Sequence, residues 1–379
     1  MNMKKILLPL LAVCGCLIMG ACANKTVEES EDFVIKRGTN LSHWLSQSWV
    51  VGEARAQRVT EADIARIAEL GFDHVRIPID EVQFWDAEGN QLPEAWALLT
   101  NALDNCIKYN LRAIVDLHII RSHNFNAGFS GGHNTLWEDE AAQDALINLW
   151  YQLSDALKDY PCKWVAYEFM NEPVADEHEQ WNKLVAKVHK ALREREPNRT
   201  LVIGSNMWQG VDTMEFLKVP EGDRHILLSC HFYHPMALTH YTAPWTESGR
   251  YFGPIQYPGV MISEEEFAKL DEKNQEVFRQ FTTEWNKERL SEMVGQAAKV
   301  AEKLGLPLYC GEWGVYQKNA PAESKYSWYR DMVEIFDEYD MSWSTWCYFD
   351  EFGFWSLEKQ EIVDQPLVDI LLSGKALGE

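Results

Sequence analysis

Two glutamates each follow a short apolar stretch and stand beside a second residue that can contact a ligand. Asn171-Glu172-Pro173 comes directly after the stretch 163–170 (KWVAYEFM), and Glu312-Trp313 follows 307–311 (PLYCG). Two carboxyl groups held at the ends of two strands can combine nucleophilic attack with proton transfer, the chemistry that cleavage of a glycosidic bond requires. Glu172 and Glu312 are therefore the candidate catalytic residues.

Other polar and aromatic residues occupy equivalent positions at the ends of further apolar stretches. Taken singly, each has an ordinary structural explanation, such as a buried ion pair or a histidine satisfied within the core. Their placement at successive strand ends favours a shared site for sugar chemistry. These residues are Arg76, His118, His231, Tyr233 and Trp346, together with Asn171 beside Glu172.

The elements that position these residues are indicated by an alternation of apolar stretches and helical patterns. One helical pattern opens with Thr60 as N-cap, has Asp63 at its third position and ends before Gly71. The alternation predicts an α/β fold, a single-domain (β/α)8 TIM barrel over residues 33–379, whose strands direct their carboxyl ends to one face. An open doubly wound sheet is the alternative, but no glycine-rich phosphate loop follows the first stretch. The expected strands are 33–41, 73–79, 111–118, 163–170, 200–205, 225–232, 307–311 and 343–349, and the expected helices are 60–70, 94–109, 139–159, 178–196, 285–305, 322–339 and 364–372.

One connection, at about 234–284, is much longer than the others. Long loops in compact domains are commonly functional or disordered, and aromatic content argues against disorder. In a barrel this connection would lie over the carboxyl face, where its aromatic rings would suit stacking on sugars. The aromatic residues are Trp245, Tyr251, Phe252 and Tyr257.

The chain resembles the retaining glycoside hydrolases of family 5, which include the cellulases, over roughly residues 33–372. That family is marked by an Arg, a His, an Asn-Glu pair, a His-x-Tyr, a second Glu and a Trp in this order. The opening segment 37–45 (RGTNLSHWL) also resembles the start of family 5 glucanases. All marker residues are present, as Arg76, His118, Asn171, Glu172, His231, Tyr233, Glu312 and Trp346.

The resemblance implies a role for each marker residue. Glu312 would be the nucleophile, kept ionised by Arg76 and Tyr233, and Glu172 would be the acid/base, with a pKa raised by burial and by Glu312. Asn171 would donate to the sugar 2-hydroxyl. The remaining substrate-binding residues would be His118, His231 and Trp346, with Trp44 and Trp245 as further aromatic contacts.

Composition restricts the substrate. The 379 residues include 58 acidic and 35 basic ones, a formal net charge of -23, which disfavours nucleic acid and acidic polysaccharides as partners. A neutral β-linked glycan is expected, most simply a β-1,4-glucan cut internally by a monomer, with no cofactor and no metal. A β-mannanase, a xyloglucanase and a β-1,3-glucanase remain alternatives on the same site. From other classes, a metal hydrolase lacks a His-x-His near the first strand, and a non-catalytic glycan-binding lipoprotein would normally lack one of the two glutamates.

The N-terminus has the pattern of a secretion signal. Two lysines precede an apolar run, and 19–22 (MGAC) resembles a bacterial lipobox. We therefore expect residues 1–21 to be a signal peptide, Cys22 to be lipidated and 22–32 to form a tether. The mature protein would be exported across the inner membrane and lipid-anchored at the outer membrane or cell surface, with the periplasmic face as the alternative.

Overall fold

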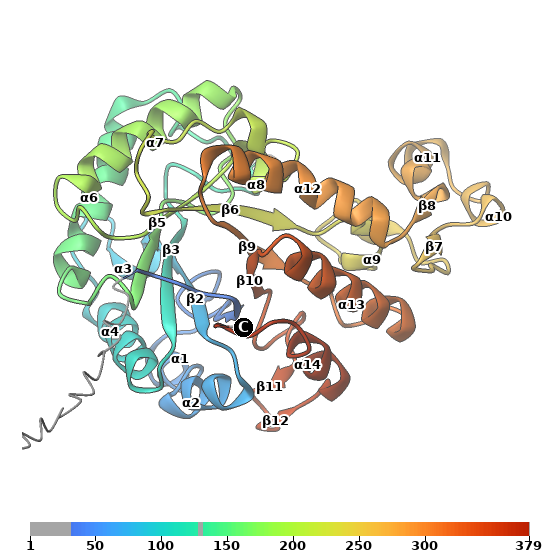
Figure 1. The fold of residues 1–379 in the computed structure, drawn as a ribbon, viewed down its shortest axis with the longest axis horizontal. Coiled ribbons are helices and arrows are strands. Elements are labelled where there is room, and N and C mark those ends of the chain that lie inside the picture. The colour runs from blue at the N-terminus through green and yellow to red at the C-terminus, as the bar shows by residue number, and fades with distance from the viewer. Residues whose placement is uncertain (1–31, 128–131, 379) are drawn as a thin grey trace, which may run out of the picture. The chain divides into compact units, whose positions relative to one another are not determined.

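The computed structural model describes residues 32–127 and 132–378. The expected signal peptide and Cys22 lie outside the described residues. Eight parallel strands close into a barrel in the order β1-β10-β9-β6-β5-β4-β3-β2, which confirms the predicted TIM barrel (Figure 1). Their bounds are β1 Arg37–Asn40, β2 His74–Asp80, β3 Arg112–Ile119, β4 Val165–Glu168, β5 Leu201–Gly204, β6 Ile226–Phe232, β9 Leu308–Trp313 and β10 Ser342–Thr345.

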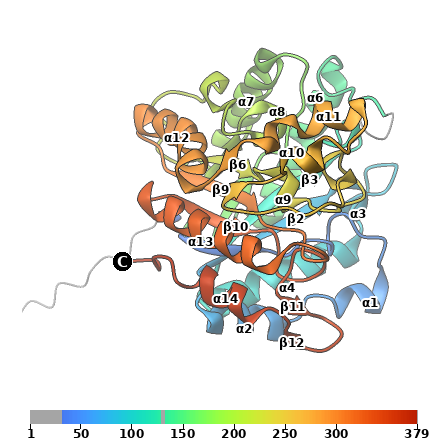
Figure 2. The ribbon, with the colours of Figure 1, turned by 90° about the vertical axis from the view of Figure 1, so that its right-hand side faces the viewer.

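Helices cover the outside of the barrel, as expected from their apolar faces (Figure 2). The predicted Thr60–Asp63 capping box forms, and Gly71 ends that helix in the left-handed conformation with φ of 99°. After β5 the connection holds only the short helices α8 (Asn206–Gln209) and η1 (Met214–Phe216). The longer helices are α2 Glu61–Leu70, α4 Pro93–Lys108, α6 Glu140–Leu157, α7 His178–Arg193, α12 Lys287–Leu304, α13 Ala322–Glu338 and α14 Gln365–Leu371. No helix in the described part of the chain is both long and apolar enough to cross a membrane.

Much of the tryptophan content belongs to the core. Eight of the 16 tryptophans are among the largest fully buried side chains. Aromatic packing between strands and helices thus accounts for many of the indoles without any role in binding. These buried residues are Trp44, Trp85, Trp150, Trp181, Trp285, Trp313, Trp328 and Trp343.

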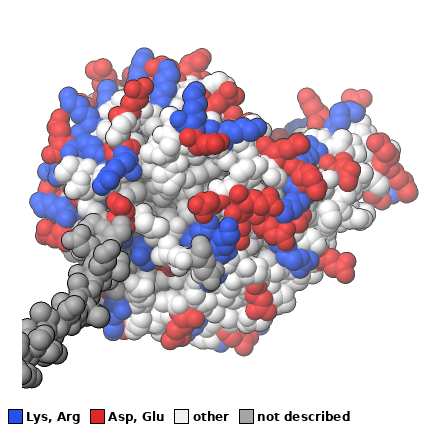
Figure 3. Space-filling view, viewed as in Figure 1, with Lys and Arg blue, Asp and Glu red and all other residues white. Residues whose placement is uncertain are grey.

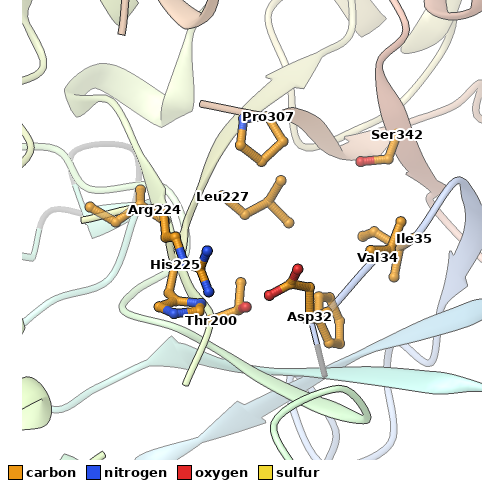
Figure 4. A pocket seen from close by; sticks show the side chains of 11 residues that line it. Asp32, Val34, Ile35, Thr200, Arg224, His225, Leu227, Pro307 and Ser342 are labelled. Atoms are coloured by element: carbon orange, nitrogen blue, oxygen red, sulfur yellow. The ribbon is translucent and has the colours of Figure 1, made fainter. Parts of the chain in front are cut away.

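The amino end of the barrel is closed by the segment that precedes β1. Phe33 and Ile35 pack against a small apolar layer inside the barrel that includes Ile114 and Leu227. A cavity of about 270 Å³ lies between this segment and the starts of the neighbouring strands (Figure 4). It lies at the amino ends of the strands, whereas catalytic groups of such barrels stand at the carboxyl ends.

The long connection after β6 is a folded lobe rather than an extended loop. It contains α9 (Met236–Thr239), η2 (Ser248–Arg250), α10 (Glu264–Phe267), α11 (Glu272–Phe278), η3 (Arg279–Thr282) and a small antiparallel sheet of β7 (Gly259–Val260) and β8 (Glu284–Trp285). Figure 1 shows α10 and α11 projecting beyond the carboxyl end of β6, and Figure 3 shows acidic side chains gathered over this lobe among fewer basic ones.

The lobe corrects part of the prediction about its aromatic residues. Tyr251 and Tyr257 are each only 3% exposed and form the interior of the lobe. The Tyr251 ring packs on Phe278 at 5.5 Å, so neither tyrosine can stack on a sugar. Trp245 and Phe252, the other two aromatic residues of the prediction, remain exposed at 48% and 74%, so a ligand can reach them.

Candidate active site

The two predicted catalytic glutamates meet at the carboxyl end of the barrel. Glu312 lies within β9, and Glu172 follows β4 by four residues. Each carboxylate has an oxygen within 4.8 Å of the other and of a ring nitrogen of His231. Glu172 adopts a φ of 44°, a left-handed conformation that costs about 1–3 kcal/mol outside glycine and is typical of functional positions.

Arg76 connects the nucleophile candidate to the barrel interior. Its side chain is fully buried in the middle of β2, and Nη1 donates to Glu312 Oε1 at 2.8 Å. The same guanidinium contacts Glu168 Oε2 at 2.6 Å and Asp116 Oδ2 at 2.9 Å. One cation therefore serves three buried carboxylates.

Asn171 is oriented by the same guanidinium. Arg76 Nη2 donates to Asn171 Oδ1 at 2.8 Å, which fixes the amide with its nitrogen pointing away from the arginine. Among the described residues, Asn171 Nδ2 is buried without a hydrogen-bond partner. A buried donor without a partner is costly, so this nitrogen is a natural place for a ligand oxygen.

The two glutamates differ in their hydrogen-bond partners. Burial raises the pKa of both, and the neighbouring Glu312 raises that of Glu172 further. Glu312 also accepts from Tyr233 Oη at 3.0 Å, in addition to Arg76, and both donors stabilise its ionised form. Glu172 is bonded at 2.8 Å to Nδ1 of His231, whose own pKa is held well below its usual value by burial. The pKa of Glu172 is therefore the higher of the two, and Glu172 is the group that keeps a proton.

The wall beside Glu312 is formed by His118 and Trp346. The two rings stack nearly parallel, with centroids 5.8 Å apart. His118 Nδ1 lies 2.6 Å from Asp116 Oδ2, and burial lowers the pKa of His118 to about 4, so the ring is neutral at pH 7. A neutral imidazole leaves this wall without a formal charge where a sugar would lie.

A metal could in principle be held by Glu172, His231 and Glu312, the group of candidate ligands found among the described residues. However, Arg76 and Tyr233 already donate to both oxygens of Glu312. The arginine charge would repel a cation at that carboxylate, so the donor set suits general acid/base chemistry better than coordination of a metal.

Comparison with known proteins identifies the family. The family model described as Cellulase (glycosyl hydrolase family 5) matches residues 28–351. The chain belongs to glycoside hydrolase family 5. Endoglucanase C of Acetivibrio thermocellus is 33% identical over 345 residues, which are 90% of this chain and 98% of that protein. Cellodextrinase A of Ruminococcus flavefaciens is 28% identical over 310 residues, 81% of this chain and 84% of that protein.

Solved structures support the same architecture. Thermotoga maritima Cel5A in complex with mannotriose superposes with a TM-score of 0.71 at 23% identity, covering 90% of this chain and 98% of that one. This likeness concerns the fold. Together with the family match, it establishes the protein as a family 5 glycosidase with a TIM-barrel fold, which hydrolyses β-glycosides.

The structure brings the eight predicted marker residues together at the carboxyl end of the barrel, and it adds two buried acids that the sequence analysis did not name. Asp116 and Glu168 lie within β3 and β4, pair in register with each other, and both contact Arg76. Their signal in the sequence is an acidic residue inside an otherwise apolar strand (AIVDLH and VAYEFM), which is rarely tolerated without a buried partner.

The prediction that Trp44 contacts the substrate is wrong. The side chain is 1% exposed, and its indole nitrogen donates to the Arg55 carbonyl at 3.0 Å. Trp44 thus holds the segment after β1 in place and offers no face to a sugar. Trp245, by contrast, stands half-exposed, edge-on to Tyr316 at 5.0 Å, close to Phe352.

Proposed function

We propose that this family 5 glycosidase is a retaining endo-β-1,4-glucanase that acts by double displacement. The observation that carries the proposal is the pair Glu172 and Glu312, whose nearest oxygens lie within 4.8 Å of each other. Carboxyl groups of retaining glycosidases are about 5–5.5 Å apart, whereas inverting enzymes leave about 6.5–9.5 Å for a water molecule between acid and base.

In the first step, Glu312 attacks the anomeric carbon while Glu172 transfers its proton to the departing glycosidic oxygen. The bond to the leaving sugar breaks as an ester to Glu312 forms. In the second step, Glu172, now ionised, takes a proton from water, and the water oxygen displaces Glu312. Glu172 is reprotonated, Glu312 is released as a carboxylate, and the anomeric configuration is retained.

The surrounding residues support the transition state through contacts that the reacting sugar would complete. Asn171 Nδ2 has no protein partner within the described residues and would donate to the 2-hydroxyl, a contact that strengthens as charge develops. Trp346 would lie beneath the sugar at the cleaved bond. His118 and His231 would bind hydroxyl groups as neutral rings, since the pKa of each is lowered by burial.

A neutral β-1,4-glucan is supported by the relatives and by the surface. The two relatives described above are named as an endoglucanase and a cellodextrinase. The net charge of -23 repels acidic polysaccharides, and exposed Trp245 suits stacking on the flat faces of equatorial glucose units.

The test is hydrolysis of a panel of barley β-glucan, carboxymethyl cellulose, xyloglucan, laminarin and galactomannan, with sizing of the products and with a chelator present in a parallel set. Preference for β-glucan or cellulose, with oligosaccharides as early products, is the expected result. A preference above tenfold for laminarin or galactomannan would refute the substrate, and loss of activity in the chelator would refute the metal-free mechanism.

We also propose that the protein is an exported, monomeric lipoprotein anchored through Cys22 at the outer membrane or cell surface. Support comes from the apolar run and the lipobox-like residues 19–22. Labelled palmitate should be incorporated into the wild-type protein and not into Cys22→Ala, which should move to the soluble fraction. Equal labelling of both proteins would refute the anchor.

A further inference from the structure

Three buried polar atoms in the barrel interior have no hydrogen-bond partner within the described residues. They are Nε2 of His231, the hydroxyl oxygen of Ser229 and Oε1 of Gln209. His231 and Ser229 lie in β6, and Gln209 is the last residue of α8, which follows β5. A buried polar atom without a partner is costly, so three of them in one region indicate hydrogen bonds that connect them.

The Ser229 hydroxyl and the His231 ring face the same point of the barrel interior. That point lies beside Gly311, in the neighbouring strand β9. A β-carbon on Gly311 would lie 3.1 Å from Ser229 Oγ and 3.1 Å from His231 Nε2. The two atoms are therefore at most about twice this distance apart, which a direct hydrogen bond or one bridging water molecule can span.

Gln209 brings its amide to the other side of Ser229. Gly204 in β5 pairs in register with Ser229, and a β-carbon on Gly204 would lie 2.5 Å from Gln209 Oε1. The amide thus takes the place of a side chain at position 204, next to the Ser229 side chain, because paired residues of parallel strands face the same side of the sheet. Gln209 has a φ of 55°, a left-handed conformation that the surrounding contacts must maintain.

The contacts of the Gln209 amide fix the direction of hydrogen bonding. Its Nε2 donates to Glu168 Oε1 and to the Met170 carbonyl, both at 3.2 Å. A carbonyl only accepts, and Glu168 already accepts two hydrogen bonds from Arg76. The nitrogen and the oxygen of the amide therefore cannot be exchanged, and Oε1 is left to accept.

This direction determines which nitrogen of His231 carries the proton. Ser229 donates its single hydroxyl hydrogen to Gln209 Oε1, which leaves the lone pairs of Oγ to accept from His231 Nε2. The ring is neutral because burial holds its pKa well below the usual value, so a proton on Nε2 leaves Nδ1 without one. Nδ1 lies 2.8 Å from Glu172 Oε1 and then accepts the hydrogen bond from that carboxyl group.

We propose that Ser229 and Gln209 are positioning residues that hold the His231 ring with its proton on Nε2, through this chain of hydrogen bonds. His231 Nδ1 is then the acceptor that favours the protonated form of Glu172. The inference rests on the proposed glucanase function and adds how the proton of the acid is held in place. The other titratable and charged groups around Glu172 and His231 are Arg76 on β2, Asp116 and His118 on β3, Glu168 on β4, Tyr233 after β6 and Glu312 on β9.

The first measurement is the pH dependence of kcat/KM on barley β-glucan, whose basic limb reports the group that must be protonated in the free enzyme. In Ser229→Ala, Nε2 loses its acceptor, so the ring favours a proton on Nδ1, which donates to Glu172 and stabilises its carboxylate. The pKa of Glu172 should fall, and the basic limb should move to lower pH by about one unit, a loss of about tenfold in kcat/KM on the alkaline side. Ser229→Thr retains the hydroxyl and should keep the wild-type limb.

The matched control is Ser342→Ala, at the start of β10. It removes a buried hydroxyl that donates to the Leu308 carbonyl at 3.3 Å, at the amino end of the barrel and away from the glutamates. The basic limb of this variant should stay at the wild-type position. A basic limb that stays in place or moves to higher pH in Ser229→Ala would overturn the inference.

The position of the ring proton gives a second measurement that is independent of activity. In protein with isotope-labelled histidine, proton–nitrogen correlation NMR distinguishes a proton on Nε2 from one on Nδ1, and His231→Gln identifies the signals of His231. The wild-type ring should carry its proton on Nε2, and Ser229→Ala should shift it toward Nδ1. A wild-type proton on Nδ1 would overturn the inference. Absence of hydrolysis by the wild-type protein would refute the proposed function, and the spectra would still decide where the proton lies.

Discussion

Tyr233→Phe tests whether hydrogen bonding, rather than exposure, determines which glutamate is ionised. The Tyr233 hydroxyl donates to Glu312 Oε2 at 3.0 Å, and Arg76 donates to the other oxygen. A hydrogen bond to a charged group contributes about 1.5–3 kcal/mol. At about 1.36 kcal/mol per pKa unit, its loss should raise the pKa of Glu312 by about 1–2 units.

The assay is the pH dependence of kcat/KM, whose acidic limb reports the group that must be ionised in the free enzyme. A higher pKa for Glu312 keeps it protonated to higher pH, so the acidic limb should move upward by about 1–2 units in Tyr233→Phe. The ring itself is retained and can still pack edge-on against His240 at 5.1 Å.

Tyr326→Phe is the matched control because it removes a hydroxyl bonded to Asp364 at 2.8 Å, on helix α13 and away from the glutamates. Its acidic limb should stay at the wild-type position. If the limb of Tyr233→Phe also stays there, the assignment of Glu312 as the ionised nucleophile is refuted.

Further predictions concern the reaction, the buried carboxylates around Arg76 and the lobe after β6. Glu172→Ala and Glu312→Ala should each lose nearly all turnover while remaining folded, and azide should partly restore the activity. NMR of the first product released by the wild-type protein should show the retained anomer, and an inverted anomer would contradict the double displacement. Arg76→Met should lower the free energy of unfolding by about 3–5 kcal/mol at pH 7, because it leaves buried carboxylates unpaired, and an unchanged denaturation midpoint would contradict this. Trp245→Ala should raise KM for β-glucan severalfold, and an unchanged KM would assign this residue a structural role only.

The barrel and the family markers could be predicted because both are local patterns. Each strand is a short apolar run between turn residues, and Glu172 or Glu312 is recognisable from its position directly after or within such a run. Asp116 was missed because strands buried on both faces read as continuous apolar runs, which hide the two-residue alternation that points a side chain inward. Its pairing with Glu168 across β3 and β4 depends on register, which only the structure provides.

Whether an aromatic side chain points into the core or into solvent also could not be predicted from the sequence. Trp44 and Trp49 lie five residues apart in one loop, yet one is 1% and the other 95% exposed. The difference arises because the loop folds back over Arg55, whose carbonyl accepts from the Trp44 indole. The interior of the lobe likewise depends on contacts between distant segments, such as the hydrogen bond from Tyr257 to Asp331 in helix α13.

The surplus of buried carboxylates explains how the site holds a proton at neutral pH. Arg76 contacts Asp116, Glu168 and Glu312, and Glu172 lies beside the last, so four acids share one permanent cation. Burial raises the pKa of Asp116 to about 7 despite the arginine, and it raises that of Glu172 well above its usual value. Since charges buried this closely cannot all persist, protons remain on the acids with the weakest donors. Glu312 accepts hydrogen bonds from an arginine and a tyrosine, whereas the hydrogen-bond partner of Glu172 is a neutral histidine. The proton therefore stays on Glu172, as its proposed role as the acid requires.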